Sequence, residues 1–158
     1  MNQFGAETVL SIHFNGHPNP ALSGTEVYYS DTGPYEANNW ALAGSVRSSL
    51  LAAVQADGYP AVDRGLHSDA YKTEYLRLAP YYGLGPNCAD CRRLFTLGNN
   101  PLSLNPGTWQ AGALVEVLFF SNPADVAYLQ QAEAPEVIAQ GLAQGIIGYL
   151  SPSPSPSP

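Results

Sequence analysis

The sequence predicts an α/β fold, because short apolar runs typical of β-strands alternate with longer stretches that have the periodicity of amphipathic helices. Hydrophobic residues make up 45% of the 158 residues and charged residues only 12%, as in chains that bury a core. A chain of this length is sufficient for one domain. We therefore expect one folded body over residues 1–150, followed by a tail over residues 151–158.

The first part of the chain predicts two strands and a long helix. Thr8 to Ile12 is a β-branched, apolar run that we interpret as a buried strand ending at His13, and Thr25 to Tyr29 follows a turn-rich stretch as a second strand. From about Tyr35 to Asp57 the pattern becomes helical, and Gly58 is a stop signal. The apolar residues of this stretch recur at helical spacing: Leu42, Val46, Leu50 and Val54.

The second part becomes regular only after residue 112. Residues 58–91 are rich in Gly, Pro, Tyr and Asp and have no clear period, whereas Arg92 to Leu97 has the composition of a strand. Ala113 to Phe120 is the clearest strand in the sequence. Ser121-Asn122-Pro123 then predicts a helix start, because Ser or Asn caps a helix and Pro fits its first turn. A last helix is expected from Pro135 to Leu150.

The composition argues against several function classes. Six Lys/Arg against thirteen Asp/Glu give a net charge of −7, so we do not expect nucleic acid or anionic lipid, which both need a cationic face, as partners. No apolar run has the length needed to span a bilayer. Residues 151–158 alternate Ser and Pro, which predicts either a polyproline-like spacer between modules or a frayed terminus.

Two ionisable residues interrupt the apolar runs. Glu116 lies inside Ala-Leu-Val-Glu-Val-Leu-Phe-Phe, where an unpaired carboxylate is costly and has to be paired, protonated or bound to a metal. His13 ends the run Val-Leu-Ser-Ile, and functional groups gather beyond the carboxyl ends of strands in open α/β sheets. Together they indicate a metal ligand and a general base. A satisfied core histidine and a buried ion pair of Glu116 with an arginine are the structural alternatives.

Four motifs, in order, resemble the catalytic family of N-acetylmuramoyl-L-alanine amidases. Ser11-Ile12-His13-Phe14-Asn15 is similar to the family's Ser-Ile-His-x-Asn, and residues 24–29 are similar to its next segment. Asp63-Arg64-Gly65 matches the Arg-Gly that follows the long helix. Residues 115–123 resemble Val-Glu-x-Gly-Phe-x-Ser-Asn-Pro, and the likeness runs from about Phe4 to Leu150.

The resemblance implies a fold and a function. The fold is a three-layer α/β/α arrangement, a mixed sheet flanked by helices, with Thr8–Ile12 and Ala113–Val117 as neighbouring interior strands. The function is zinc-dependent hydrolysis of the amide bond between N-acetylmuramic acid and L-alanine in peptidoglycan, by a protein exported to the periplasm or cell wall. In the family, two histidines and a glutamate hold the zinc ion and a second glutamate is the catalyst.

By residue match, His13 is the second zinc histidine and Glu116 is the catalytic glutamate, and we expect Asn15 and Arg64 to line the substrate cleft. This sequence departs from the family pattern in three places. The family's opening strand, Gly-His-Gly-Gly turn and zinc glutamate have no counterpart before Thr8, Leu118 replaces a glycine, and a long insertion lies between Gly65 and Gly112.

The first departure predicts that the sequence is the C-terminal two-thirds of a longer enzyme, incomplete at the N-terminus. Alone, it is expected to expose apolar sheet surface, to bind zinc weakly and to release little peptide from peptidoglycan. The bulk of Leu118 beside Glu116 is expected to narrow the cleft. The alternative function is a non-catalytic wall-binding or structural remnant of the amidase fold.

Other candidate groups have simpler interpretations. His17 and Glu26 are candidates for a substitute metal site, although a solvated loop histidine and an exposed or paired glutamate are the roles we expect. His67 has either a surface position or a place in the cleft. Cys88 and Cys91 are the only cysteines, and in an exported protein we expect a local disulfide, with free thiols as the alternative.

Overall fold

The computed structural model describes residues 5–71, 80, 83, 97 and 108–151. Its regular elements follow in chain order: β1 (Thr8–Asn15), β2 (Thr25–Tyr29), α1 (Glu36–Ala56), β3 (Asp63–Ser68), η1 (Asp69–Tyr71), β4 (Ala111–Phe119), α2 (Pro123–Leu129) and α3 (Ala134–Leu150). The predicted strands and helices that fall in this part are present, with boundaries within two residues at most ends. Residues 92–96 of the strand predicted at 92–97, both cysteines and the tail from residue 152 lie outside the described residues.

The strands form one mixed sheet in the order β1-β4-β2-β3. β1 and β4 are parallel, β2 is antiparallel to β4, and β2 and β3 are parallel. The α/β class, the mixed sheet and the pairing of Thr8–Ile12 with the strand that holds Ala113–Val117 are therefore confirmed.

The prediction that both of these strands are interior was wrong for β1. β4 is interior and buried along most of its length, but β1 lies at the edge of the described sheet and is only partly buried. The physical reason is that β1 has a neighbour on one side only: among the described residues, no strand pairs with the side of β1 that faces away from β4.

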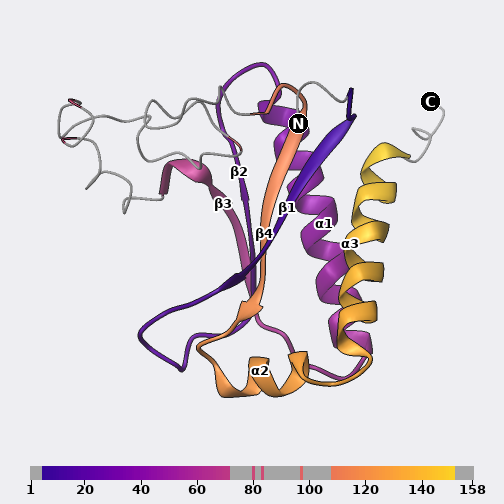
Figure 1. Cartoon of the computed structure of the whole chain (residues 1–158). Helices are drawn as coiled ribbons and strands as arrows, with labels where there is room; N and C mark the ends of the chain where they lie inside the picture. The colour runs from indigo at the N-terminus through magenta and orange to yellow at the C-terminus, as the bar shows by residue number, and fades with distance from the viewer. Residues whose placement is uncertain (1–4, 72–79, 81–82, 84–96, 98–107, 152–158) are drawn as a thin grey trace.

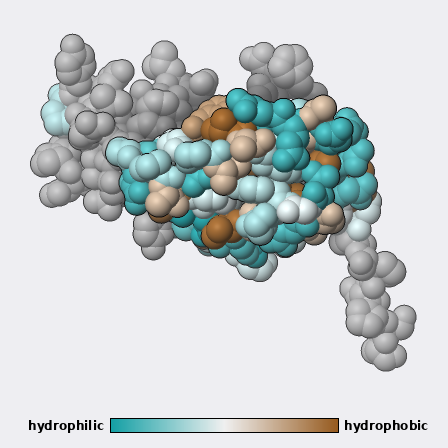
Figure 2. Space-filling model, turned by 90° about the horizontal axis from the view of Figure 1, so that it is seen from below, coloured by the Kyte–Doolittle hydropathy of each residue, from teal (hydrophilic) through white to brown (hydrophobic). Residues whose placement is uncertain are grey.

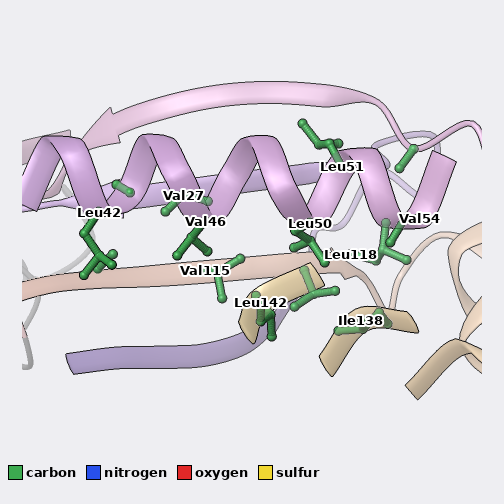
Figure 3. Packing of buried hydrophobic residues seen from close by; sticks show 14 of the residues in the cluster. Val27, Leu42, Val46, Leu50, Leu51, Val54, Val115, Leu118, Ile138 and Leu142 are labelled. Atoms are coloured by element: carbon green, nitrogen blue, oxygen red, sulfur yellow. The ribbon is translucent and has the colours of Figure 1, made fainter. Parts of the chain in front are cut away.

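The core lies between the sheet and the two long helices. α1 and α3 pack against each other and lie on the same side of the sheet, so no helix of the described ranges forms the third layer on the other side (Figure 1). Apolar side chains of α1 face those of β4 and α3 (Figure 3). These residues, which are at most 7% exposed, include Leu42, Val46, Leu50, Val54, Val115, Val117, Ile138 and Leu142.

Small residues allow the two helices to approach closely. A Cβ atom at Gly145 would lie 2.5 Å from the Val46 Cα atom, and one at Gly141 would lie 3.0 Å from the Leu50 Cα atom. The Ser45 hydroxyl donates a hydrogen bond across the interface to the Gly145 carbonyl (2.7 Å). Glycine at these positions therefore sets the distance between α1 and α3.

The predicted start of the helix after β4 is confirmed. The Asn122 side chain accepts hydrogen bonds from the backbone N–H groups of Ala124 (2.9 Å) and Asp125 (3.0 Å), and Pro123 is the first helical residue. The resulting short helix, α2, lies beyond the carboxyl ends of β1 and β4 (Figure 1). Seen from that end, the surface is largely hydrophilic, with separate hydrophobic patches (Figure 2).

An apolar groove follows the open edge of the sheet. It has a volume of about 750 Å³ and lies between β1 and α3. Its lining residues are all apolar and include Leu10, Ile12, Phe14, Phe120, Ile138 and Ile146. Ile12 is 55% exposed and Phe120 is 61% exposed, which confirms the expected exposure of apolar surface beside the first strand.

Two features of the sheet differ from expectation. β3 falls in the stretch that has no recognisable period, because Asp63-Arg64-Gly65-Leu66-His67-Ser68 does not alternate apolar and polar residues. Leu118 does not narrow a cleft beside Glu116, since it is fully buried in the core against the helices (Figure 3). The pairing of β1 with β4 shifts register between His13 and Asn15, and this irregularity places both Val117 and Leu118 on the core side.

Candidate active site

The two residues that interrupt the apolar strands are brought together. His13 and Glu116 are register partners on the parallel strands β1 and β4. Neighbouring strands lie about 4.8 Å apart, and partner side chains point to the same face. The residues on either side of Glu116, Val115 and Val117, belong to the core beneath the helices, so Glu116 and His13 belong to the opposite face.

A third ionisable residue completes a row across the sheet. Glu26 on β2 is the register partner of Glu116 on the other side of β4. The order along this row is therefore His13, Glu116, Glu26, with one residue from each of three adjacent strands. Glu116 is partly buried and Glu26 is 5% exposed, whereas His13 is exposed.

The His13 ring has a defined partner on its own strand. Its Nε2 atom lies 2.8 Å from the Ser11 hydroxyl oxygen. Ser11 and His13 alternate with Ile12, which lines the groove on the helix side, so both polar side chains lie on the face of Glu116. The contact with Ser11 leaves Nδ1 as the ring nitrogen that would coordinate a metal.

Glu26 is the centre of a polar network. Its Oε1 atom accepts hydrogen bonds from the Asn15 side-chain amide (2.6 Å) and the Tyr28 hydroxyl (2.9 Å). Its Oε2 atom accepts a charge-assisted hydrogen bond from Arg64 Nε (2.9 Å) and lies 3.8 Å from His67 Nε2. The two predicted cleft residues, Asn15 and Arg64, thus bind the same carboxylate.

Ring contacts hold the outer members of this network. The Arg64 guanidinium carbon lies 5.0 Å from the centre of the Phe119 ring, within the range of a cation–π contact. The centres of the His67 and Tyr28 rings lie 5.3 Å apart, and the His67 Nε2 atom is 3.0 Å from the Arg64 carbonyl oxygen. His67 is partly buried beside Glu26, so it lies at the candidate site, while its role in a substrate cleft stays a prediction.

The surroundings keep Glu26 ionised. Burial raises the pKa of its carboxyl, but hydrogen bonds from Arg64 and Tyr28 and the charges of Arg64 and His67 lower it by more. The pKa of Glu26 therefore lies below its ordinary value. The expectation that Glu26 is exposed or paired is met by its pairing with Arg64.

The remaining histidine is a loop residue, as expected. His17 is exposed, its backbone N–H donates to the Ser121 hydroxyl (3.0 Å), and its Nδ1 atom accepts a hydrogen bond from the Asn19 backbone N–H (2.9 Å). Within the described ranges, no group of three or more His, Cys, Asp or Glu side chains is arranged to hold a metal ion. His13 and its neighbours here therefore do not form a complete three-ligand zinc site.

Comparison with known proteins identifies the family. A family model described as N-acetylmuramoyl-L-alanine amidase matches residues 1–148. The chain belongs to the N-acetylmuramoyl-L-alanine amidase family. The identification made from its sequence motifs is confirmed. No curated protein sequence matches the chain.

Solved amidase structures share the fold of this amidase-family chain. The N-acetylmuramoyl-L-alanine amidase AmiC2 of Nostoc punctiforme is 26% identical with a TM-score of 0.56, and the match covers 92% of this chain and 58% of that one. An amidase from Clostridium difficile 630 is 20% identical with a TM-score of 0.62, covering 97% and 62%. The apo amidase Ami1 of Mycobacterium abscessus is 24% identical with a TM-score of 0.62, covering 95% and 57%. The matched part is thus less than two-thirds of each of these relatives.

The parts that Ser11, Tyr28 and Phe119 play in the site were not recognised from the sequence. Ser11 and Tyr28 belong to matched motifs, but nothing in the sequence shows that they contact His13 and Glu26. The stacking of Arg64 on Phe119 joins residues from β3 and β4 that lie far apart in the sequence.

Within the described ranges, no helix has the length and apolar character needed to cross a membrane.

Proposed function

We propose that this chain is the catalytic part of a peptidoglycan hydrolase that cleaves the amide bond between N-acetylmuramic acid and L-alanine. One observation carries the proposal: in a member of the amidase family, His13 and Glu116 are register partners on one face of the sheet. The family name gives the class of bond, and the pairing supplies a candidate metal ligand beside a candidate proton acceptor.

Glu116 is the proposed general base. Its carboxylate would accept a proton from the attacking water, whose oxygen bonds to the carbonyl carbon of the lactyl group. The carbon–nitrogen bond to L-alanine then breaks, and the same proton passes from Glu116 to the leaving nitrogen. The position of Glu116 in the middle strand, between His13 and Glu26, supports this role because its side chain can reach groups on both sides.

Zinc is the proposed cofactor, with His13 as one ligand. When bound, zinc lowers the pKa of a coordinated water and polarises a carbonyl oxygen. Ser11 would orient the His13 ring through its contact with Nε2. The described residues supply only part of a three-ligand set, so further ligands have to come from outside them. The weak zinc binding and low activity expected of the 158-residue chain alone therefore remain predictions.

The proposed partner is the cell wall, and the proposed location is outside the cytoplasmic membrane. The net charge of −7 agrees with a target other than nucleic acid or anionic lipid. In such an oxidising compartment, Cys88 and Cys91 are predicted to form a disulfide. Thiol labelling of native exported protein would contradict that prediction.

A second candidate function is a non-catalytic wall-binding remnant. The observation in its favour is that no three-ligand cluster exists among the residues the structure describes. Such a protein would bind peptidoglycan without releasing peptide, and added zinc would not cause any release.

Digestion of purified peptidoglycan distinguishes the two candidates. The amidase hypothesis predicts zinc-dependent release of peptides that begin with a free L-alanine amino group and leave an intact lactyl carboxylate, both identified by mass spectrometry. Chelation should abolish release and added zinc should restore it. Binding to the wall without any release, in zinc-loaded protein, would favour the remnant.

A further inference from the structure

The Glu26 carboxylate connects strands that the backbone ladder leaves separate. β1 and β2 are not neighbours, because β4 lies between them. The hydrogen bond from Asn15 to Glu26 nevertheless joins the end of β1 to β2 across β4. The bond from Arg64 joins the same carboxylate to β3, and Arg64 in turn lies over Phe119 of β4. One buried side chain thus links all four strands at the site.

This connection lies where the ladder is irregular. β1 and β4 pair without interruption from Thr8 to His13, and the register then shifts before Asn15, which pairs with Phe119. After the shift, β1 is held by its backbone bond to Phe120 (2.8 Å) and by the bond between the Asn15 and Glu26 side chains. The position of His13 relative to Glu116 therefore depends on how firmly the next two residues of β1 are fixed.

From this geometry we infer that Glu26 is a positioning residue for the His13–Glu116 pair, a role that rests on the proposed amidase function. Glu26 is 5% exposed and both of its oxygens are occupied by neighbouring groups, so it does not itself touch substrate. It holds Asn15 on one side and Arg64 on the other, and thereby keeps the carboxyl end of β1 in place beside Glu116. A displacement of a reacting group by about 1 Å lowers rates by about 100-fold, which makes such a constraint consequential.

The alternative is an ion pair that stabilises the fold without affecting the site. The two roles differ in what the substitution Glu26→Gln changes. Gln keeps an oxygen that can accept from Asn15 and Tyr28, but it places an NH2 group against the Arg64 Nε–H donor. A purely structural role predicts a lower melting temperature and an unchanged rate for the folded enzyme. A positioning role predicts a lower rate as well.

The test measures peptidoglycan hydrolysis by the zinc-loaded holoenzyme, kept in excess zinc because weak zinc binding is expected of the 158-residue chain, at a temperature where every variant is folded. For Glu26→Gln we expect kcat to fall about 10- to 100-fold while KM changes less than about twofold, because the residue does not contact substrate. Glu26→Asp, which keeps both charged oxygens, should recover part of the loss. The matched control is Asp63→Asn. Asp63 precedes Arg64 in the sequence and pairs with Arg47 (Nη1 to Oδ2, 2.5 Å), so this variant removes the charge of another arginine-bound carboxylate and should leave kcat unchanged.

A second measurement keeps the inference testable if the amidase activity itself is absent. Hydrogen exchange of the Phe120 backbone amide, which donates to the Asn15 carbonyl, reports how firmly the end of β1 is held. Its protection should fall at least about tenfold in Glu26→Gln relative to Asp63→Asn. Unchanged protection would overturn the positioning role, and so would an unchanged kcat in an active enzyme. No hydrolysis by wild-type holoenzyme would overturn the proposed function alone.

Discussion

Replacing Asp125 tests the hydrogen bonds that fix the carboxyl end of β4. Asp125 is fully buried at the start of α2. Its Oδ2 atom accepts from the backbone N–H groups of Phe119 (2.8 Å) and Gly24 (3.2 Å). Its Oδ1 atom accepts from the hydroxyls of Ser23 (2.6 Å) and Tyr59. One carboxylate therefore ties α2 to β4 and to the segment that leads into β2.

The expected loss in free energy of unfolding depends on which of the hydrogen-bond donors to Asp125 can find another partner. In Asp125→Ala the two hydroxyls can rotate to other partners, but the two buried backbone N–H groups cannot. Each unsatisfied buried group costs about 1–3 kcal/mol, so the loss should be about 2–6 kcal/mol of the free energy of unfolding. In Asp125→Asn the side-chain oxygen can face the backbone groups and its NH2 group can face the hydroxyls. The loss should then be only about 1–2 kcal/mol.

Urea unfolding followed by circular dichroism measures these differences. Asp63→Ala is the matched control, because it removes a half-exposed carboxylate whose pair with Arg47 is worth about 1 kcal/mol or less. We expect the order Asp63→Ala, Asp125→Asn, Asp125→Ala from least to most destabilised. Equal losses for the two Asp125 variants, or a loss below about 1 kcal/mol for Asp125→Ala, would refute the assignment of its energy to the backbone donors.

Three further predictions concern the core, the tyrosines and the open edge. Gly145→Ala should destabilise by about 1–3 kcal/mol, because its Cβ would lie 2.5 Å from Val46 Cα. Gly148→Ala, whose Cβ would meet only the Ser45 hydroxyl at 3.1 Å, should be near neutral in the same denaturation assay. Burial, and a hydrogen bond to Asp57, raise the pKa of Tyr128 to about 12. Since the folded-state pKa lies above the unfolded value of 10.0, this contribution to stability is complete below pH 10 and is lost as the pH rises towards 12. Melting temperatures of Tyr128→Phe should therefore fall less than those of the wild type across this window, and an equal fall would contradict the assignment. The exposed apolar groove at the open edge predicts self-association of the chain, and Phe14→Lys places a charge there, so self-association measured by light scattering should decrease. An unchanged mass distribution would show that the groove does not mediate self-association.

The part of the candidate site that could be predicted from the sequence is the part whose ionisable residues stand inside apolar runs. Glu116 and His13 interrupt apolar runs, and a polar group in such a run requires a partner or a function. The structure adds that the two are register partners, which the sequence could not show because their strands are separated by most of the chain.

Other features were not predictable because they depend on the packing of distant segments. Glu26 reads as an ordinary paired glutamate, and its position between Asn15 and Arg64 appears only when β1, β2 and β3 are assembled. β3 lacks an alternating pattern because Arg64 and His67 serve the network and Gly65 has a positive φ angle of 95°. The burial of Leu118 follows from a register shift that no local propensity indicates.

The most direct test of the His13–Glu116 site is to measure zinc content and peptide release together in the zinc-loaded holoenzyme. Glu116→Gln should keep the wild-type zinc content and lose peptide release by about 100- to 10,000-fold, the range for a general acid–base group. His13→Ala should lose zinc and activity together. A Glu116→Gln enzyme that still releases L-alanine-bearing peptide at the wild-type rate, or a His13→Ala enzyme that keeps its zinc, would contradict the assignment of these two residues as base and ligand.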